Sequence, residues 1–327
     1  MNGSFATLGF VTPAASVIAH RHVQVGSLSM HLAEAGEGPL VLLLHGFPES
    51  WYSWRHQLTA LAAAGYHAVA PDQRGYCQTT APASAAEYTI LHLTGDVIAL
   101  MDALGAADAV IAGHDWGAPV AWHTALFRPD RIRGVIALSV PYRPRGSSPP
   151  IATLRRHLGD AFYMVYFQEP GVADAELSRD PVTTFRTVLC SLSGEGPAMT
   201  LIPAGGGFLD AASDPGTLPS WLTDQDIDAY VTQYAQAGFT GPLNWYRNMD
   251  RNWELTAAWQ HAPIAAPAVF AAGDRDPVLS FVSPDSLTTF VPGLTRSVIL
   301  PGCGHWTQQE RPGDVTAVML EFLAQLP

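Results

Sequence analysis

Residues 110–122 read VIAGHDWGAPVAW, and this stretch decides the fold. Asp115 stands between Gly113 and Gly117. That is the spacing of a sharp turn from a strand into a helix, because larger side chains at either end of the turn would clash. The apolar residues before the turn are typical of a buried strand, and residues 118–127 are typical of a helix. The pattern therefore predicts a strand–turn–helix unit that holds the Asp115 side chain at its tip.

The aspartate at the tip of this turn narrows the chemistry, because most turns of this kind carry serine there. A carboxylate that attacks a saturated carbon forms an alkyl ester, which water can later cleave. A serine that attacked the same carbon would form an ether, and an aspartate that attacked an ordinary ester would form a reactive anhydride. Asp115 therefore predicts attack on saturated carbon and disfavours esterase chemistry.

Strand-like and helix-like segments alternate on both sides of the turn. Continuous apolar runs are typical of strands covered on both faces, and apolar residues spaced by three and four are typical of helices. The alternation predicts an α/β fold with a mostly parallel sheet and helices on both faces. The expected strands are 20–25, 28–34, 40–44, 67–71, 109–112, 132–140, 268–272 and 297–300, and the expected helices of this part are 51–64, 91–104 and 312–326.

The alternation stops near Pro141, and the chain then becomes helical and aromatic up to about residue 258. We expect a helical insertion, or cap domain, over 142–258 and a core domain formed by 1–141 and 259–327. The Gly- and Pro-rich stretch 194–219 is expected to be a long, mobile loop. The helices expected in the cap are 151–158, 181–192, 224–237 and 243–253.

The composition excludes several classes of partner. The 327 residues carry 29 acidic and 17 basic side chains, which disfavours binding to nucleic acid, since that needs a basic surface. No stretch predicts a membrane span, and the first 20 residues are expected to be a tail rather than a signal peptide. The three cysteines lie at spacings typical of neither a metal site nor a disulfide framework, which predicts a cytoplasmic protein with no bound metal. Cys303 is expected to be a structural residue.

Three further segments follow predicted strands, at the edge where open α/β sheets bind ligands. In the first, HGFPES at 45–50, the backbone N–H of Phe47 is expected to form an oxyanion hole with that of Trp116. The other two, at 273–277 and 302–306, supply Asp276 and His305.

These segments predict a reaction in two steps. After Asp115 has formed an ester, His305, held by Asp276, deprotonates a water that attacks the ester carbonyl carbon. The order nucleophile, acid and histidine is that of α/β-hydrolases. Asp274 is the alternative acid, and the neighbouring His114 is expected to be structural. His45 is expected to brace the oxyanion turn, and His123 and His157 to be ordinary helix residues.

With these residues in place, the sequence resembles the soluble-type epoxide hydrolases of the α/β-hydrolase fold family over about residues 20–325. The resemblance implies an eight-stranded, mostly parallel sheet with an inserted helical cap, and an enzyme that needs no cofactor. The motifs that carry it are HGFPES (45–50), DQRGY (72–76), GHDWGAPVAW (113–122), YFQEPGVADAE (166–176), NWYRNMDRNW (244–253) and GHWTQ (304–308).

The resemblance also implies the electrophilic partner of the reaction. Two cap tyrosines of this family donate hydrogen bonds to the epoxide oxygen, and the matching positions are Tyr163 and Tyr246, with Tyr166 as the competitor of the first. A cis bond between Phe47 and Pro48 is implied in the oxyanion turn. The expected pocket walls, besides Trp116, are Pro119, Phe167, Val278, Leu279 and Trp306.

The sequence thus predicts hydrolysis of a small lipophilic epoxide by water to a vicinal diol. A haloalkane dehalogenase is the nearest alternative, but Phe47 offers no side-chain N–H donor to a departing halide. A non-catalytic binding protein on the same fold is the other alternative, and it would be expected to lack part of the triad. The oligomeric state is open, with a homodimer among the alternatives.

Overall fold

The computed structural model describes residues 17–197, 199–212 and 216–326. Most of the tail expected over the first 20 residues lies outside these ranges, and β1 begins at Ala19. Residues 198 and 213–215, within the expected loop 194–219, also lie outside them.

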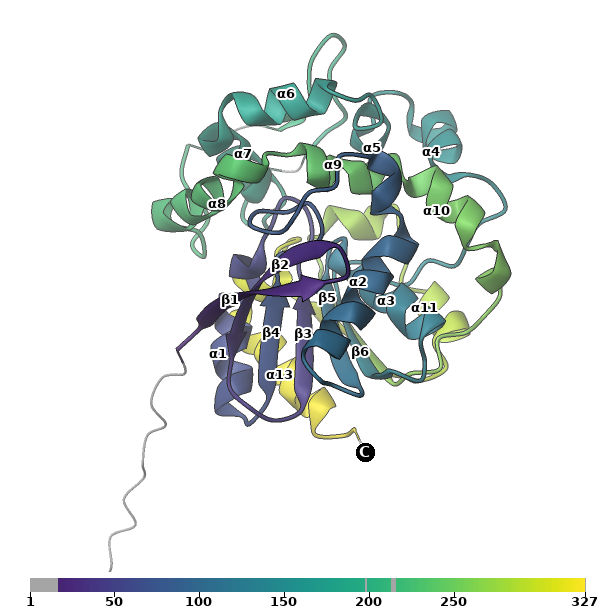
Figure 1. Cartoon of the computed structure of the whole chain (residues 1–327). Helices are drawn as coiled ribbons and strands as arrows, with labels where there is room; N and C mark the ends of the chain where they lie inside the picture. The colour runs from purple at the N-terminus through teal and green to yellow at the C-terminus, as the bar shows by residue number, and fades with distance from the viewer. Residues whose placement is uncertain (1–16, 198, 213–215, 327) are drawn as a thin grey trace, which may run out of the picture.

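An eight-stranded sheet runs through the centre of the molecule in the order β1-β2-β4-β3-β5-β6-β7-β8 (Figure 1). β1 pairs antiparallel with β2, and β2 pairs antiparallel with β4, whereas the other neighbours are parallel. The predicted mostly parallel sheet is confirmed, and its parallel strands end at one common edge. The strands are β1 (Ala19–Val25), β2 (Leu28–Ala35), β3 (Leu40–Leu44), β4 (His67–Pro71), β5 (Ala109–His114), β6 (Ile132–Leu138), β7 (Ala268–Gly273) and β8 (Leu294–Leu300).

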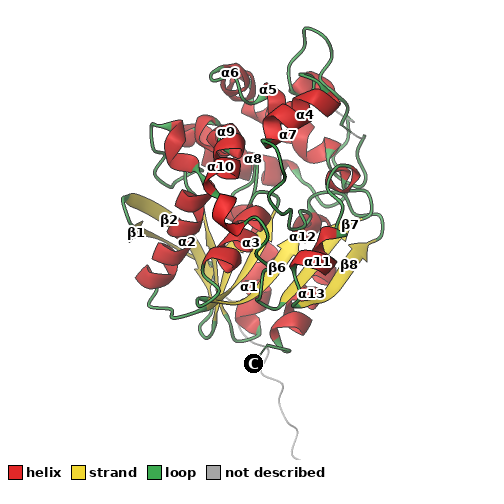
Figure 2. Cartoon of the chain, turned by 90° about the vertical axis from the view of Figure 1, so that its right-hand side faces the viewer, coloured by secondary structure: helices red, strands yellow, loops and turns green. Residues whose placement is uncertain are grey.

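Helices cover both faces of the sheet, because the central strands are apolar on both faces (Figure 2). Leu42, Leu44 and Ile111 pack into one core cluster, while Val41 and Leu43, which alternate with them, pack into the other. The core helices are η1 (Trp51–Trp54), α1 (Arg55–Ala63), η2 (Ala85–Tyr88), α2 (Ile90–Ala103), α3 (Gly117–Phe127), η5 (Pro277–Ser280), α11 (Ser286–Phe290), α12 (Thr307–Glu310) and α13 (Pro312–Leu323).

A layer of short helices lies between β6 and β7 in the sequence and above the carboxyl ends of the strands in space (Figure 1). α5 and α6 were not expected from the sequence, and the stretch 194–219 contains only one helical turn, η3, among its described residues. The elements of this layer are α4 (Pro150–Leu158), α5 (Tyr163–Tyr166), α6 (Val172–Arg179), α7 (Pro181–Ser191), η3 (Leu209–Ala211), α8 (Asp224–Ala237), α9 (Thr240–Arg247), α10 (Met249–Leu255) and η4 (Ala257–Trp259).

One helix expected from the sequence is divided in the structure. The segment 243–253 forms the end of α9 and most of α10, and Asn248 separates them. The Asn248 side chain donates to the carbonyl of Ala85 at 2.6 Å and to that of Asn244 at 2.8 Å. A side-chain amide that satisfies backbone carbonyls in this way competes with regular helix hydrogen bonding, which is a local reason for the break.

Helix α8 joins the helical layer to the core through buried polar contacts. The Tyr234 hydroxyl donates to the carbonyl of Glu49 at 2.9 Å, and the Asp226 carboxylate lies 2.9 Å from the Arg55 guanidinium and accepts from the Tyr52 hydroxyl at 3.0 Å. Breaking such buried contacts would leave polar groups unsatisfied, so they hold the layer over the strand ends. Among the described residues, no helix has both the length and the apolar character that crossing a membrane requires.

Candidate active site

The turn after β5 adopts the strained geometry that its glycines predict. Asp115 has a φ of 48°, in the left-handed region that non-glycine residues rarely occupy. A Cβ atom at Gly113 would lie 2.1 Å from the carbonyl oxygen of Gly117, and one at Gly117 would lie 2.0 Å from that of Leu44. Only glycine therefore fits either position, and α3 begins at once after Trp116.

The Asp115 carboxylate is held between two of the other predicted segments. The backbone N–H of Phe47 donates to Asp115 Oδ1 at 2.7 Å, and His305 Nε2 lies 3.4 Å from Asp115 Oδ2. Gly46 permits this approach, since a Cβ atom there would lie 2.2 Å from Asp115 Oδ1. The cis bond between Phe47 and Pro48, implied by the family resemblance, is present.

His305 is buried and faces a carboxylate with each ring nitrogen. Its Nδ1 lies 3.1 Å and 3.2 Å from the two oxygens of Asp276. Burial by itself lowers the pKa of His305. The charge of Asp276, the hydrogen bonds to Asp115 and Asp276, and the charge of Asp115 together raise that pKa well above its usual value. Burial by itself raises the pKa of Asp276. The charge of His305 and the hydrogen bonds from His305, Ser139 and the Val278 N–H together more than offset it, so that this pKa is lowered.

Ser139 completes this group and was missed by the sequence analysis. It follows β6, is fully buried and has a φ of 70°. Its hydroxyl donates to Asp276 Oδ2 at 2.5 Å, and the same oxygen lies 2.9 Å from His305 Nδ1. The sequence signal was only a polar residue at the carboxyl end of a predicted strand, which many unrelated serines share.

Tyr163 and Tyr246 line the same cavity as Asp115. The cavity has a volume of about 330 Å³, and Asp115, His305 and both tyrosines line it. The centres of the two phenol rings are 6.1 Å apart. Burial, and after it the charge of Asp115, raises the pKa of each tyrosine well above its usual value of 10, so both hydroxyls are neutral hydrogen-bond donors at neutral pH.

The predicted pocket walls divide into three groups. Val278 lines the cavity, whereas Pro119 and Trp116 line a neighbouring one. Phe167 and Trp306 are buried behind the wall: Phe167 meets the ring of Tyr246 edge to face at 5.1 Å, and Trp306 meets that of His305 at 4.8 Å. Leu279 is half-buried and lies outside both sets of lining residues. Lining residues that sequence analysis missed include Leu158, Phe162, Val188, Leu192, Met199, Leu201, Phe208 and Phe281.

Two buried glutamates link the segments that surround Asp115. Glu49 accepts hydrogen bonds from the N–H of Gly46 at 3.0 Å, from the side chain of Gln308 at 2.9 Å, and lies 2.7 Å from His114 Nδ1. Burial by itself raises the pKa of Glu49, but its interaction with His114 lowers it. Glu310 likewise accepts from backbone N–H groups on both sides of His305, among them that of Gly304 at 3.0 Å.

The competing residues lie elsewhere. The Asp274 carboxylate accepts from the N–H of Gly302 at 2.7 Å, and the Tyr166 hydroxyl donates to Glu176 at 2.8 Å, so that neither faces the cavity. His45 Nε2 accepts from the N–H of Gln73 at 3.1 Å, beside the turn that carries Phe47.

Three further side chains, which the sequence predicts to be structural or ordinary helix residues, lie apart from the catalytic group. Cys303 is buried. His157 is exposed on α4, while His123 is half-buried and its Nδ1 lies 2.7 Å from the carbonyl oxygen of Pro119. Within the described ranges, no three His, Cys, Asp or Glu side chains are grouped as a metal site would need.

Comparisons with known proteins identify relatives of this chain. Residues 39–312 match the family model of the alpha/beta hydrolase fold. The chain is 48% identical to epoxide hydrolase A of Mycobacterium tuberculosis over 94% of its own length and 97% of that protein. It is 44% identical to epoxide hydrolase 3 of Siraitia grosvenorii, over 94% and 98% of the two chains. The crystal structure of epoxide hydrolase A from Mycobacterium thermoresistibile superposes with a TM-score of 0.92 at 48% identity, covering 95% of this chain and 99% of that one.

Proposed function

This chain belongs to the α/β-hydrolase fold family and is an epoxide hydrolase, and we propose that it hydrolyses its substrate through a covalent ester on Asp115. The observation that carries the proposal is the position of the Asp115 carboxylate. It lies 2.7 Å from the Phe47 N–H and 3.4 Å from His305, and it lines one cavity with Tyr163 and Tyr246.

In the first step, Asp115 Oδ2 attacks one carbon of the epoxide and the bond from that carbon to the ring oxygen breaks. The Tyr163 and Tyr246 hydroxyls donate to this oxygen as negative charge develops on it, which stabilises the alkoxide and supplies its proton. Their raised pKa keeps both groups protonated until the oxygen becomes basic enough to take a proton. The product of this step is a hydroxyalkyl ester of Asp115.

In the second step, His305 Nε2 removes a proton from water and the resulting hydroxide attacks the carbonyl carbon of the ester. Asp115 Oδ1 carries the negative charge of the tetrahedral intermediate, and the N–H groups of Phe47 and Trp116 stabilise it as an oxyanion hole. The intermediate collapses, and the diol leaves with a proton returned from His305. The carboxylic acid left on Asp115 passes its proton to the tyrosinate formed in the first step, which restores the Asp115 carboxylate and the tyrosine hydroxyl. The sum of both steps is epoxide plus water giving a vicinal diol.

The same elements support the assignment of the remaining roles. Asp276 orients His305 and stabilises its protonated form through the contact at 3.1 Å. The cap domain at 142–258 encloses the substrate, and the apolar side chains of Phe162, Val188 and Phe208 around the cavity suit a small lipophilic epoxide. The three cysteines are buried, which fits a cytoplasmic enzyme whose thiols stay reduced.

A single turnover in ¹⁸O-labelled water tests the ester directly. The water oxygen is expected in the Asp115 side chain and not in the first diol released, because the attack takes place at the carboxyl carbon. His305→Gln is expected to accumulate a protein adduct with the mass of the epoxide, while Asp115→Ala forms none. Label in the first diol would contradict the proposal, since water would then have attacked the epoxide itself.

The two tyrosines are tested against a matched control. Tyr163→Phe and Tyr246→Phe each remove a donor from the cavity and are expected to slow formation of the adduct about 10-fold to 100-fold. Tyr166→Phe removes a hydroxyl that faces Glu176 and is expected to retain activity. Equal losses in all three variants would overturn the assigned roles.

A further inference from the structure

A second cavity, of about 500 Å³, adjoins the active-site cavity but shares no lining residue with it. Trp116 lines the second cavity and Tyr246 lines the first, and their rings meet edge to face with centres 5.2 Å apart. The two aromatic rings therefore form part of the wall between the cavities. Since Trp116 follows Asp115 in the sequence, a ligand in the second cavity would contact the residue beside the nucleophile, on the other side of this wall.

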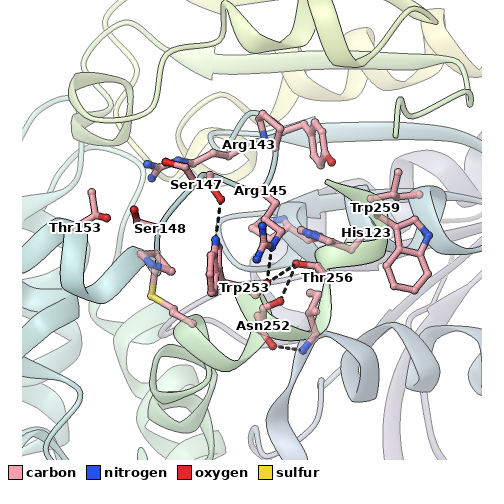
Figure 3. A pocket seen from close by; sticks show the side chains of 18 of the residues that line it. His123, Arg143, Arg145, Ser147, Ser148, Thr153, Asn252, Trp253, Thr256 and Trp259 are labelled. Carbon is pink, nitrogen blue, oxygen red and sulfur yellow. Dashed lines mark hydrogen bonds between the residues drawn. The ribbon is translucent and has the colours of Figure 1, made fainter. Parts of the chain in front are cut away.

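The second cavity is apolar at depth and polar toward solvent. Ile90 and Leu126 are buried, Met249 and Trp259 are half-buried, and the Ser148 side chain is exposed. In Figure 3, labelled side chains from α3, from the segment after β6, from α4 and from α10 surround the same space. Such a shape accepts an apolar stem and leaves a polar head near the surface.

The charge of this cavity is opposite to that of the chain. Arg143, Arg145 and Arg156 line it, whereas no Asp or Glu is present among the described residues that do so. The whole chain carries 29 acidic against 17 basic residues. Burial lowers the pKa of His123, which also lines the cavity, so this imidazole adds no charge at neutral pH.

The arginines of the second cavity have no carboxylate partner in the described part of the chain. Arg145 is held by neutral groups: its Nε donates to the carbonyl of Trp253 at 2.7 Å, and its guanidinium lies 3.9 Å above the Trp253 ring (Figure 3). For the side chains of Arg143 and Arg156, no hydrogen bond or ion pair is found within the described ranges. Other arginines of the chain pair with carboxylates, as Arg74 does with Asp96 at 2.7 Å.

We propose that the second cavity binds an organic carboxylate with an apolar stem. Three arginines among the lining residues match a carboxylate head, because guanidinium donors pair with carboxylate oxygens in a planar, charge-assisted geometry. The apolar inner end then takes the stem up to Trp116. The carboxylate is either the far end of an elongated substrate or a separate acid, and only the first source rests on the proposed function.

Calorimetric titration with octanoate, with 1-octanol as the uncharged ligand of equal chain length, tests the site without any turnover. Octanoate is expected to bind about tenfold more tightly than octanol. The double variant Arg143→Gln/Arg156→Gln is expected to remove this preference. Arg155→Gln is the matched control. Arg155 lies beside Arg156 on α4, but it pairs with Asp160 and does not line the cavity.

A second variant tests whether the double substitution acts through the charge of the cavity rather than through a change in its structure. Ser148→Glu places a carboxylate among the arginines and is expected to weaken octanoate binding while octanol binding stays unchanged. The proposal is overturned if octanoate binds to the parent enzyme no more tightly than octanol, or if the double variant keeps the parent's preference for octanoate. It is also overturned if the control Arg155→Gln loses as much affinity for octanoate as the double variant.

Kinetics distinguish the two sources of the carboxylate. For a substrate that uses its own far end, the ratio of kcat/KM for 9,10-epoxydecanoate to that for its methyl ester is expected to fall about tenfold in Arg143→Gln/Arg156→Gln. If the site binds a separate acid, this ratio of kcat/KM values is expected to be the same in the parent enzyme and the double variant. Added octanoate is then expected to change the KM of a neutral epoxide in the parent enzyme but not in the double variant. Absence of turnover with every epoxide would refute the proposed function and leave the titration result standing.

Discussion

At the scale of single residues, the His305 imidazole lies between two carboxylates. Asp276 faces Nδ1 at 3.1 Å and Asp115 faces Nε2 at 3.4 Å, and both raise the pKa of the ring. Formation of the ester would neutralise Asp115 and remove one of these two influences. The pKa of the histidine would therefore be higher before the attack. Once the ester has formed, a larger fraction of the imidazole would be neutral and able to accept a proton from water.

The effect of Asp115 on His305 can be measured in the resting enzyme. Asp115→Asn mimics the neutral ester, and the pKa of His305 is expected to fall relative to the parent enzyme. An NMR titration of the imidazole in both proteins checks this. Asp274→Asn is the control, since Asp274 binds Gly302 and not His305, and it should leave the titration unchanged. An unchanged pKa of His305 in Asp115→Asn would show that the charge of Asp115, 3.4 Å from His305 Nε2, does not affect the protonation of the imidazole.

Ser139 is a positioning residue for the same pair, and its removal is expected to slow the second step. Ser139→Ala deletes a buried donor to a charged carboxylate, which predicts a fall in kcat of about tenfold with accumulation of the ester. Ser139→Gly deletes the same hydroxyl but accepts the φ of 70° without strain. Equal rates in the two variants, both below the parent, assign the effect to the hydroxyl. Full activity in Ser139→Gly would refute the positioning role.

At the scale of elements, the turn between β5 and α3 depends on close backbone approach. A Cβ atom at Gly117 would lie 2.0 Å from the carbonyl oxygen of Leu44, and neither β3 nor α3 can move without disturbing the packed sheet. This contact explains why the nucleophile lies so close to the carboxyl end of β3, where the turn with Phe47 begins.

Gly117→Ala is therefore expected to destabilise the protein by about 3 kcal/mol or more, because the new methyl group overlaps backbone atoms. Gly95→Ala is the matched control, since a Cβ at Gly95, on α2, meets nothing within 4 Å. That variant is expected to be neutral or more stable by up to about 1 kcal/mol. Denaturant unfolding of both variants measures the difference, and similar stabilities would contradict the steric argument.

At the scale of the whole molecule, ionised carboxyl groups join distant segments. Glu49 links three segments around the site, Asp276 pairs with His305, and Asp226 joins the helical layer to Arg55. The pKa of each of these carboxyls is lowered in the folded protein, because nearby basic groups and hydrogen bonds more than offset burial. Their stabilising effect is present above their usual pKa values and is lost as the pH falls through the lowered ones.

The free energy of unfolding is therefore expected to decrease steeply below about pH 4. Glu310 acts in the opposite sense: burial raises its pKa, so it costs stability at neutral pH and this cost disappears on protonation. Asp226→Asn is expected to give a shallower acid transition than the parent, whereas Asp285→Asn, an exposed site, keeps the parent's slope. Denaturant unfolding between pH 3 and 7 checks this, and equal slopes in all three proteins would contradict it.

The fold and the type of chemistry could be predicted because they depend on local patterns. Strands buried on both faces are continuous apolar runs, and the turn at Asp115 needs small residues at fixed spacing, so both can be recognised in the sequence. Within the helical layer the prediction was less complete: α5 and α6 were missed, and Asn248 divides one expected helix through contacts with Ala85, which is distant in sequence.

By itself, the sequence determined the mostly parallel sheet and a carboxylate at its strand-to-helix turn, because periodicity and turn sterics act over a few residues. Only the tertiary structure decided that Ser139 joins Asp276 and His305, that Tyr163 and not Tyr166 lines the cavity of Asp115, and that arginines without carboxylates line a second cavity. The physical reason is that hydrogen bonds and charges act over a few ångströms in space, and the packing of the helical layer on the sheet sets which side chains come within that range.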